Sequence, residues 1–155
     1  MKFSTKEDIE APIEAVFDML GDFEFFERAA MRRGAEVQRT DTKNVPGVGM
    51  GWRASFPLRG KRRQVDIELV TYDRPTEMVF ECRSPNLIAM LTVELVALSR
   101  SRTRIMVSTD IKPLNLSARL LVQSLKLAKT SLTKKYKLRI AEFAKSLEDR
   151  HKRVA

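Results

Sequence analysis

The chain of 155 residues has one cysteine, Cys82, and one histidine, His151. A single cysteine cannot close a disulfide within the chain. One cysteine and one histidine also leave little from which to build a Cys/His zinc site, a Ser-His-Asp triad or a Cys-His pair. The composition therefore argues against most hydrolytic enzymes, and it predicts neither a metal nor another cofactor.

Long apolar runs are also missing. The most apolar stretch, residues 87–98, contains Glu94 and falls short of the about 20 residues that a membrane-spanning helix needs. The opening residues, MKFSTKED, lack the apolar core of a secretory signal, so we expect a cytoplasmic protein. With 43% hydrophobic and 32% charged residues, the composition is that of a globular protein. We expect a single domain over residues 1–149 and a flexible basic tail at 150–155.

The positive charge is concentrated near the C-terminus. The net charge is +9, and residues 114–155 hold eleven Lys or Arg against three Asp or Glu. Such residues could attract the phosphates of lipid headgroups or of nucleic acid, or they could form an ordinary solvated surface. Nucleic acid is disfavoured because no aromatic residues alternate with the basic ones. Contact with an anionic membrane is therefore the favoured alternative to a solvated surface. The basic positions considered are Lys126, Lys129, Lys134, Lys135, Lys137, Lys145 and the turn Arg59, Gly60, Lys61, Arg62, Arg63.

Periodicity predicts the elements. Residues 3–9 alternate as a strand does, and short helices are expected at residues 12–20 and from Asp22 to Gly34. From Ala35 to Pro113 the period is two, and turn signals divide this stretch into six strands joined by short connections, which indicates an antiparallel sheet. Residues 114–147 keep apolar side chains three or four apart without Gly or Pro, which predicts one long helix.

Two stretches, IEAPIEAVFDMLGD at residues 9–22 and GVGMGW at 47–52, resemble the START-like superfamily, also called SRPBCC or the polyketide cyclase/dehydrase-like group. The resemblance implies an α+β helix-grip fold. In this fold a curved antiparallel sheet of about seven strands, with two short helices after the first strand, wraps around a long C-terminal helix. Most members bind sterols, lipids, quinones or polyketides between sheet and helix, and a minority are cyclases, dehydratases or oxygenase subunits. The oxygenase members carry Cys and His motifs that are missing here.

The resemblance implies that the chain binds or transfers a hydrophobic small molecule without catalysis, in a cavity between the sheet and the C-terminal helix. Trp52 alternates in phase with Met50 and Phe56, so we expect its ring to be buried on the concave side of the sheet. Plain core packing is the alternative for the aromatic residues Trp52, Phe56 and Phe80 and for the residues expected from the C-terminal helix. Cys82 would act as a small apolar group. The residues expected to line the cavity are Trp52, Phe56, Val65, Ile67, Leu69, Phe80, Cys82, Leu91, Val93, Ile105, Val107, Leu121, Leu125, Ala128 and Leu132.

Two other functions stay open. In a cofactor-independent cyclase or dehydratase, Glu7 or Glu94 would be the general base, which requires that one of these carboxylates faces the cavity. Alternation places Glu94 on the solvated face, whereas Glu7 falls in phase with Phe3 and Ile9 on the inner face. Alternatively, the basic helix is an interaction module that docks on an anionic membrane. The sequence gives no indication of the oligomeric state.

Overall fold

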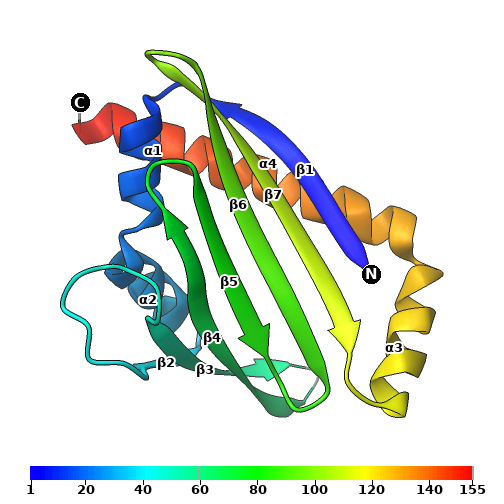
Figure 1. Ribbon diagram of the computed structural model, residues 1–155. Helices are drawn as coiled ribbons and strands as arrows, with labels where there is room; N and C mark the ends of the chain where they lie inside the picture. Colours follow the sequence, from blue (N-terminus) through cyan, green and yellow to red (C-terminus); the bar gives the residue numbers. More distant parts are fainter. Residues whose placement is uncertain (59, 155) are drawn as a thin grey trace.

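The computed structural model describes residues 1–58 and 60–154, and its centre is one curved antiparallel sheet of seven strands (Figure 1). The strand order is β1-β7-β6-β5-β4-β3-β2. Strands β2 to β7 therefore form a meander in which each strand pairs with the next one in sequence, and β1 pairs with β7 at the edge of the sheet. The strands are β1 (Lys2–Ile9), β2 (Glu36–Arg39), β3 (Gly51–Leu58), β4 (Lys61–Asp73), β5 (Glu77–Arg83), β6 (Leu87–Ser99) and β7 (Arg102–Pro113).

Two pairs of helices flank the meander. Helices α1 (Ile13–Leu20) and α2 (Phe23–Arg32) follow β1, and α3 (Leu116–Lys126) and α4 (Lys129–Val154) follow β7. Pro12 precedes α1, where its missing N–H does no harm, and Gly21 separates α1 from α2. Helices α2 and α4 lie on the far side of the sheet in Figure 1, which is its concave face. This arrangement is the α+β helix-grip fold that the resemblance implied.

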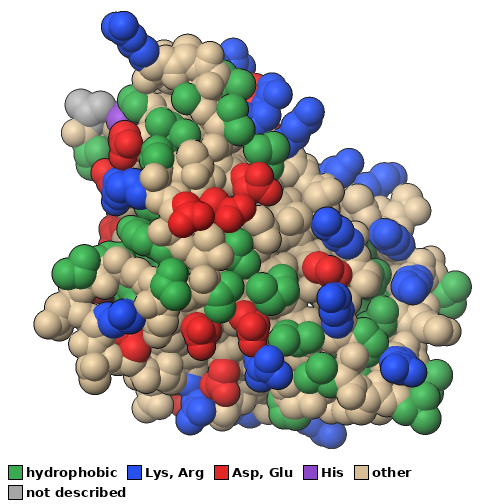
Figure 2. All heavy atoms as spheres, viewed as in Figure 1, with side chains coloured by type: hydrophobic (Ala, Val, Ile, Leu, Met, Phe, Trp, Pro, Cys, Tyr) green, Lys and Arg blue, Asp and Glu red, His purple; other side chains and the backbone are tan. Residues whose placement is uncertain are grey.

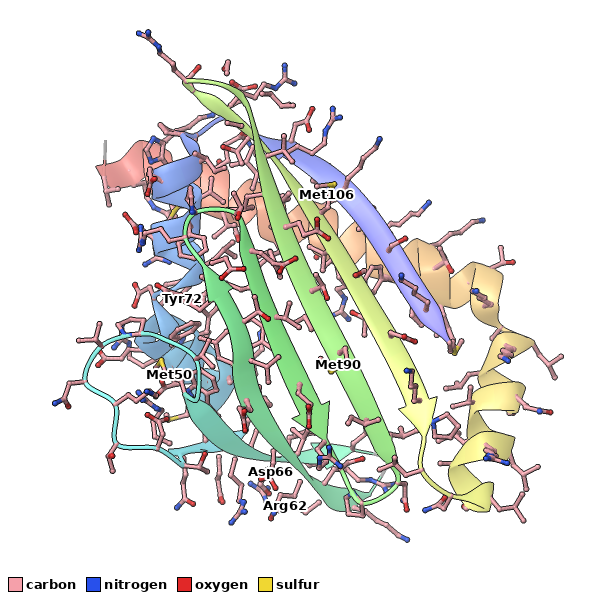
Figure 3. The ribbon with its side chains drawn as sticks, in the orientation of Figure 1. Met50, Arg62, Asp66, Tyr72, Met90 and Met106 are labelled. Carbon is pink, nitrogen blue, oxygen red and sulfur yellow. The ribbon has the colours of Figure 1, made fainter. Side chains whose placement is uncertain are left out.

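Alternation sorts the side chains between the two faces of the sheet. Leu91, Val93 and Leu95 of β6 point toward the helices, whereas Glu94 is exposed on the opposite face. Met90 and Met106, labelled in Figure 3, belong to that outer face, which is turned toward the reader. The six strands expected between Ala35 and Pro113 are all present.

The core lies between the concave face of the sheet and the helices α1, α2 and α4. Phe17 of α1, Leu69 of β4 and Ile105 of β7 are almost completely buried, as is Leu147 of α4. A bulge between Leu69 and Thr71 changes the phase of β4. The ring of Tyr72 (Figure 3) consequently packs on Phe17, with 5.1 Å between ring centroids.

The C-terminal segment differs from the expected single helix. It is divided at Leu127 and Ala128, whose N–H groups donate to carbonyls three residues back, those of Ser124 and Leu125, at 3.2 and 3.0 Å. Without Gly or Pro at the break, the cause is tertiary: α3 packs on β7 through Ala118 and Val122, whereas α4 turns away across β1 and the concave face. A continuous helix could not follow both surfaces.

The last described residues of the chain belong to α4. The helix continues to Val154, through the residues for which the sequence suggests a flexible basic tail, and Ala155 lies outside the described residues. The Arg150 guanidinium pairs with Asp22 and lies 4.0 Å from the ring centre of Phe25. Among the described residues, none of the helices combines the length and the apolar character that crossing a bilayer requires.

Candidate functional site

A cavity of about 440 Å³ lies between the concave face of the sheet and the helices α2 and α4. Its size falls within the range of small-molecule sites in proteins. Apolar side chains form nearly all of its surface. The lining residues are Leu20, Phe23, Phe26, Glu27, Ala30, Val37, Trp52, Ala54, Ile67, Met78, Phe80, Cys82, Leu91, Val93, Val107, Ile140 and Phe143.

Aromatic rings form one wall of the cavity. Trp52 of β3 is only 6% exposed, and its ring centroid lies 5.1 Å from that of Phe23 and 6.4 Å from that of Phe80. Phe23 and Phe80 meet edge to face at 6.2 Å. Such packing fixes the rings and leaves flat apolar surface toward the cavity. The prediction that Trp52 is buried on the concave side is confirmed.

Glu27 of α2 is the one carboxylate among the lining residues. The indole Nε1–H of Trp52 donates to its Oε2 at 3.1 Å. A guanidinium, that of Arg39, lies 5.7 Å from the Trp52 ring centre, but its Nε and Nη2 donate to Asp41 at 2.9 and 2.6 Å. That hydrogen bond raises the pKa of Arg39, and the nearby negative charge of Glu27 adds a smaller contribution.

Cys82 lines the cavity from β5. Burial raises the pKa of its thiol, and the negative charge of Glu81 acts in the same direction. A raised pKa keeps the sulfur protonated near neutral pH, where it is a poor nucleophile. These surroundings agree with the expectation that Cys82 acts as a small apolar group.

Of the sheet residues expected at the cavity, Trp52, Ile67, Phe80, Cys82, Leu91, Val93 and Val107 line it. Four others do not. Leu69 and Ile105 are fully buried in the hydrophobic core and are not among the residues that line the cavity. Phe56 and Val65 lie nearer the β3–β4 turn and are half-buried.

The four helix residues expected to close the cavity lie elsewhere. Leu121 and Leu125 belong to α3, Ala128 to the break, and Leu132 to the first turns of α4. The break carries this part of the chain away from the cavity, and the cavity is closed instead by Ile140 and Phe143, two to three turns further along α4.

The two candidate bases do not reach the cavity. Glu94 is exposed on the outer face of the sheet, where it pairs in register with Met106. Glu7 does lie on the inner face, in register with Ile105, but it is not among the lining residues. Within residues 1–58 and 60–154, no three His, Cys, Asp or Glu side chains gather where they could hold a metal ion.

The contribution of α2 to the site was not expected from the sequence. Phe23, Phe26 and Ala30 share one face of α2 by their spacing, and Glu27 follows Phe23 by four residues, so it lies on the same face of the helix. A charged residue on the apolar stripe of a short helix was the available signal. That α2 would cover a cavity depends on the sheet curvature, which periodicity does not report.

The family model for polyketide cyclase/dehydrase and lipid transport proteins matches residues 1–148 of the chain. No match was found among curated proteins.

Several solved structures are similar, all at low sequence identity. TTHA0849 from Thermus thermophilus has 16% identity and a TM-score of 0.66, covering 97% of this chain and 96% of that one. The Zhui aromatase/cyclase from Streptomyces sp. R1128 has 12% identity and a TM-score of 0.61, covering 86% and 88%. A START superfamily protein from Mycobacterium smegmatis has 13% identity and a TM-score of 0.57, covering 86% and 95%. At these identities the likeness shows a shared fold.

Proposed function

Because the chain belongs to the polyketide cyclase/dehydrase and lipid transport family, we propose that it binds or transfers a hydrophobic small molecule, such as a lipid, an isoprenoid or quinone, or a polyketide-like compound, without catalysing a reaction. The main support is the apolar cavity of about 440 Å³ between the sheet, α2 and α4. Transferring apolar surface from water to such a site yields about 25 cal/mol per Å². The cytoplasmic location expected from the sequence is part of this proposal.

A cavity-filling variant tests the proposal. Ala54 lines the cavity from β3, so Ala54→Phe should fill part of its volume and weaken the binding of an apolar probe such as dodecan-1-ol by about tenfold or more. Ala97→Phe, at an exposed position near the end of β6, is the matched control and should bind as the wild type does. Equal affinity in all three proteins, measured by isothermal titration calorimetry, would place the probe outside the cavity.

Native mass spectrometry of the protein purified from its own source addresses the ligand directly. A bound organic molecule that is absent from Ala54→Phe would support the proposal and give the ligand class. A wild-type protein that carries no organic molecule and also fails to bind apolar probes would refute it.

A second candidate function, peripheral docking on an anionic membrane, is supported by α3. Its apolar side chains point into solvent: Leu116 is 71% exposed and Leu120 64%, and Leu127 after its end is 92% exposed. Between Asp110 and Glu142 the chain has eight Lys or Arg and no acidic residue. Hydrophobic and basic side chains accordingly alternate along the right-hand edge of the molecule, over α3 (Figure 2). Leucines that insert at the interface and cations that meet phosphates suit an anionic lipid surface.

Vesicle co-sedimentation distinguishes this docking from simple ligand storage. The wild-type protein should sediment with vesicles of phosphatidylglycerol and phosphatidylcholine, less with phosphatidylcholine alone, and less at high salt. The triple variant Leu116→Ser/Leu120→Ser/Leu127→Ser should lose most of this binding. Val45→Ser, an exposed apolar residue outside α3, should not change it. Equal binding by the triple variant would exclude α3 as the docking element.

A further inference from the structure

The cavity is apolar except at one place, the carboxylate of Glu27. Among the seventeen lining residues it is the only one with a formal charge at neutral pH. A carboxylate offers about four acceptor positions, and the indole of Trp52 occupies one of them. None of the residues that the structure describes forms an ion pair or a second side-chain hydrogen bond with Glu27. The remaining acceptor positions are therefore available to a molecule in the cavity.

The surroundings of Glu27 do not neutralise it at close range. Arg39 is the nearest guanidinium described above, and its Nε and Nη2 are used by Asp41. Arg39 and Asp41 pair with each other, so Glu27 remains the one charged side chain that lines this end of the cavity among the described residues. The aromatic rings beside it, those of Phe23, Trp52 and Phe80, have electron-rich faces that attract cations and repel anions.

We infer that Glu27 selects the ligand of this cavity: an apolar molecule whose polar end donates a hydrogen bond, a hydroxyl or a protonated amine, and not a free fatty acid or another anionic lipid. This inference rests on the proposed function, and it adds a ligand class to it. The apolar part of the molecule contacts the sheet and α4, and its donor replaces water at the carboxylate of Glu27. An anionic head at this place would bring a second negative charge close to that of Glu27, which is unfavourable.

Three probes with the same chain, dodecan-1-ol, dodecylammonium and dodecanoate, test the inference by isothermal titration calorimetry below their aggregation limits at about 0.15 M salt. Wild-type protein should bind the alcohol and the amine at least about tenfold more tightly than dodecanoate, since a charge-assisted hydrogen bond is replaced by a repulsion. A larger preference for the amine would show that charge contributes, and equal affinities for alcohol and amine would show that the hydrogen bond suffices. Both results agree with the inference.

Glu27→Gln is the decisive variant, because its amide oxygen still accepts from Trp52 while the negative charge is lost. This variant should bind the alcohol and the amine less than about threefold more tightly than dodecanoate, mainly because it binds dodecanoate more tightly than the wild type does. Glu24→Gln, one turn earlier on α2, is the control; Glu24 is exposed and pairs with Arg28, so the wild-type ranking should persist.

The outcomes separate the two proposals. If wild-type protein binds all three probes within threefold, or prefers dodecanoate, the role of Glu27 is refuted while binding in the cavity stands. The role is also refuted if Glu27→Gln folds normally by circular dichroism and keeps the wild-type ranking. If the wild-type protein binds none of the probes, the proposed function and this inference fail together.

Discussion

At the scale of single residues, Trp52 contributes to the cavity in two ways. Its ring is part of the aromatic wall of the cavity, and its Nε1–H fixes the side chain of Glu27 at 3.1 Å. The alternation of β3 was enough to predict its burial. The partner on α2 was not predictable in the same way, because strand periodicity says nothing about which helix covers the strand.

We predict that Trp52→Ala lowers the free energy of unfolding by about 3 kcal/mol or more, because a large buried side chain leaves empty space. Trp52→Phe keeps an aromatic ring and loses the hydrogen bond to Glu27, so its cost should be nearer about 1 kcal/mol. Urea unfolding followed by circular dichroism measures both, since Trp52 is the only tryptophan and fluorescence is lost with it. Equal costs for the two variants would show that the volume of the indole is unimportant.

At the scale of elements, the strands were predictable and the helix break was not. A strand with one solvated face alternates, as β6 and β7 do, and alternation survives in the sequence whatever the strand packs against. Residues 114–147 keep one helical period through Leu127 and Ala128, so nothing local marks the break. The helix is divided because α3 packs on β7 whereas α4 packs across the concave face. For this reason the residues that close the cavity lie further along the chain than the sequence predicted.

Helix α3 should be easier to unfold locally than the rest of the fold. Its principal contacts are with β7, and its first turn depends on Asn115, whose side chain accepts from the Ala118 N–H at 2.9 Å and donates to Asn86 at 2.8 Å. We predict that Asn115→Ala destabilises α3 by about 1 kcal/mol. Hydrogen exchange should accelerate at α3 amides and stay unchanged in β5 and β6, whereas Ser117→Ala should change neither. Faster exchange throughout the sheet would show that α3 supports the whole domain.

At the scale of the whole molecule, Asp41 connects stability to pH. The side chain of Arg39 and the N–H groups of Gly51 and Lys43 donate to its carboxylate and lower the pKa of Asp41 well below its usual range. A carboxyl with a lowered pKa stabilises the fold above its unfolded value, near 4, and loses that contribution as the pH falls.

We predict that Asp41→Asn is less stable than the wild type at pH 7 and that the difference narrows as the pH falls below about 4, because the unfolded wild-type chain then binds a proton at Asp41 that the folded protein, with its lowered pKa, does not bind. Urea unfolding at a series of pH values measures this difference. A constant difference over the whole range would mean that the charge of Asp41 is unimportant and that only the geometry of the residue 40–50 loop changed.

The pairing of β1 with β7 has a consequence for the order of assembly. Phe3 lies opposite Thr109, so the first strand of the chain has its partner more than 100 residues later, whereas β2 to β7 pair with their sequence neighbours. Closing so long a loop is entropically costly, and β7, the partner of β1, is the last of the seven strands to be synthesised. The meander can therefore form hairpin by hairpin while β1, the first strand to be synthesised, is still unpaired. Docking of β1, followed by α4 across it, then completes the domain as a late and slow step.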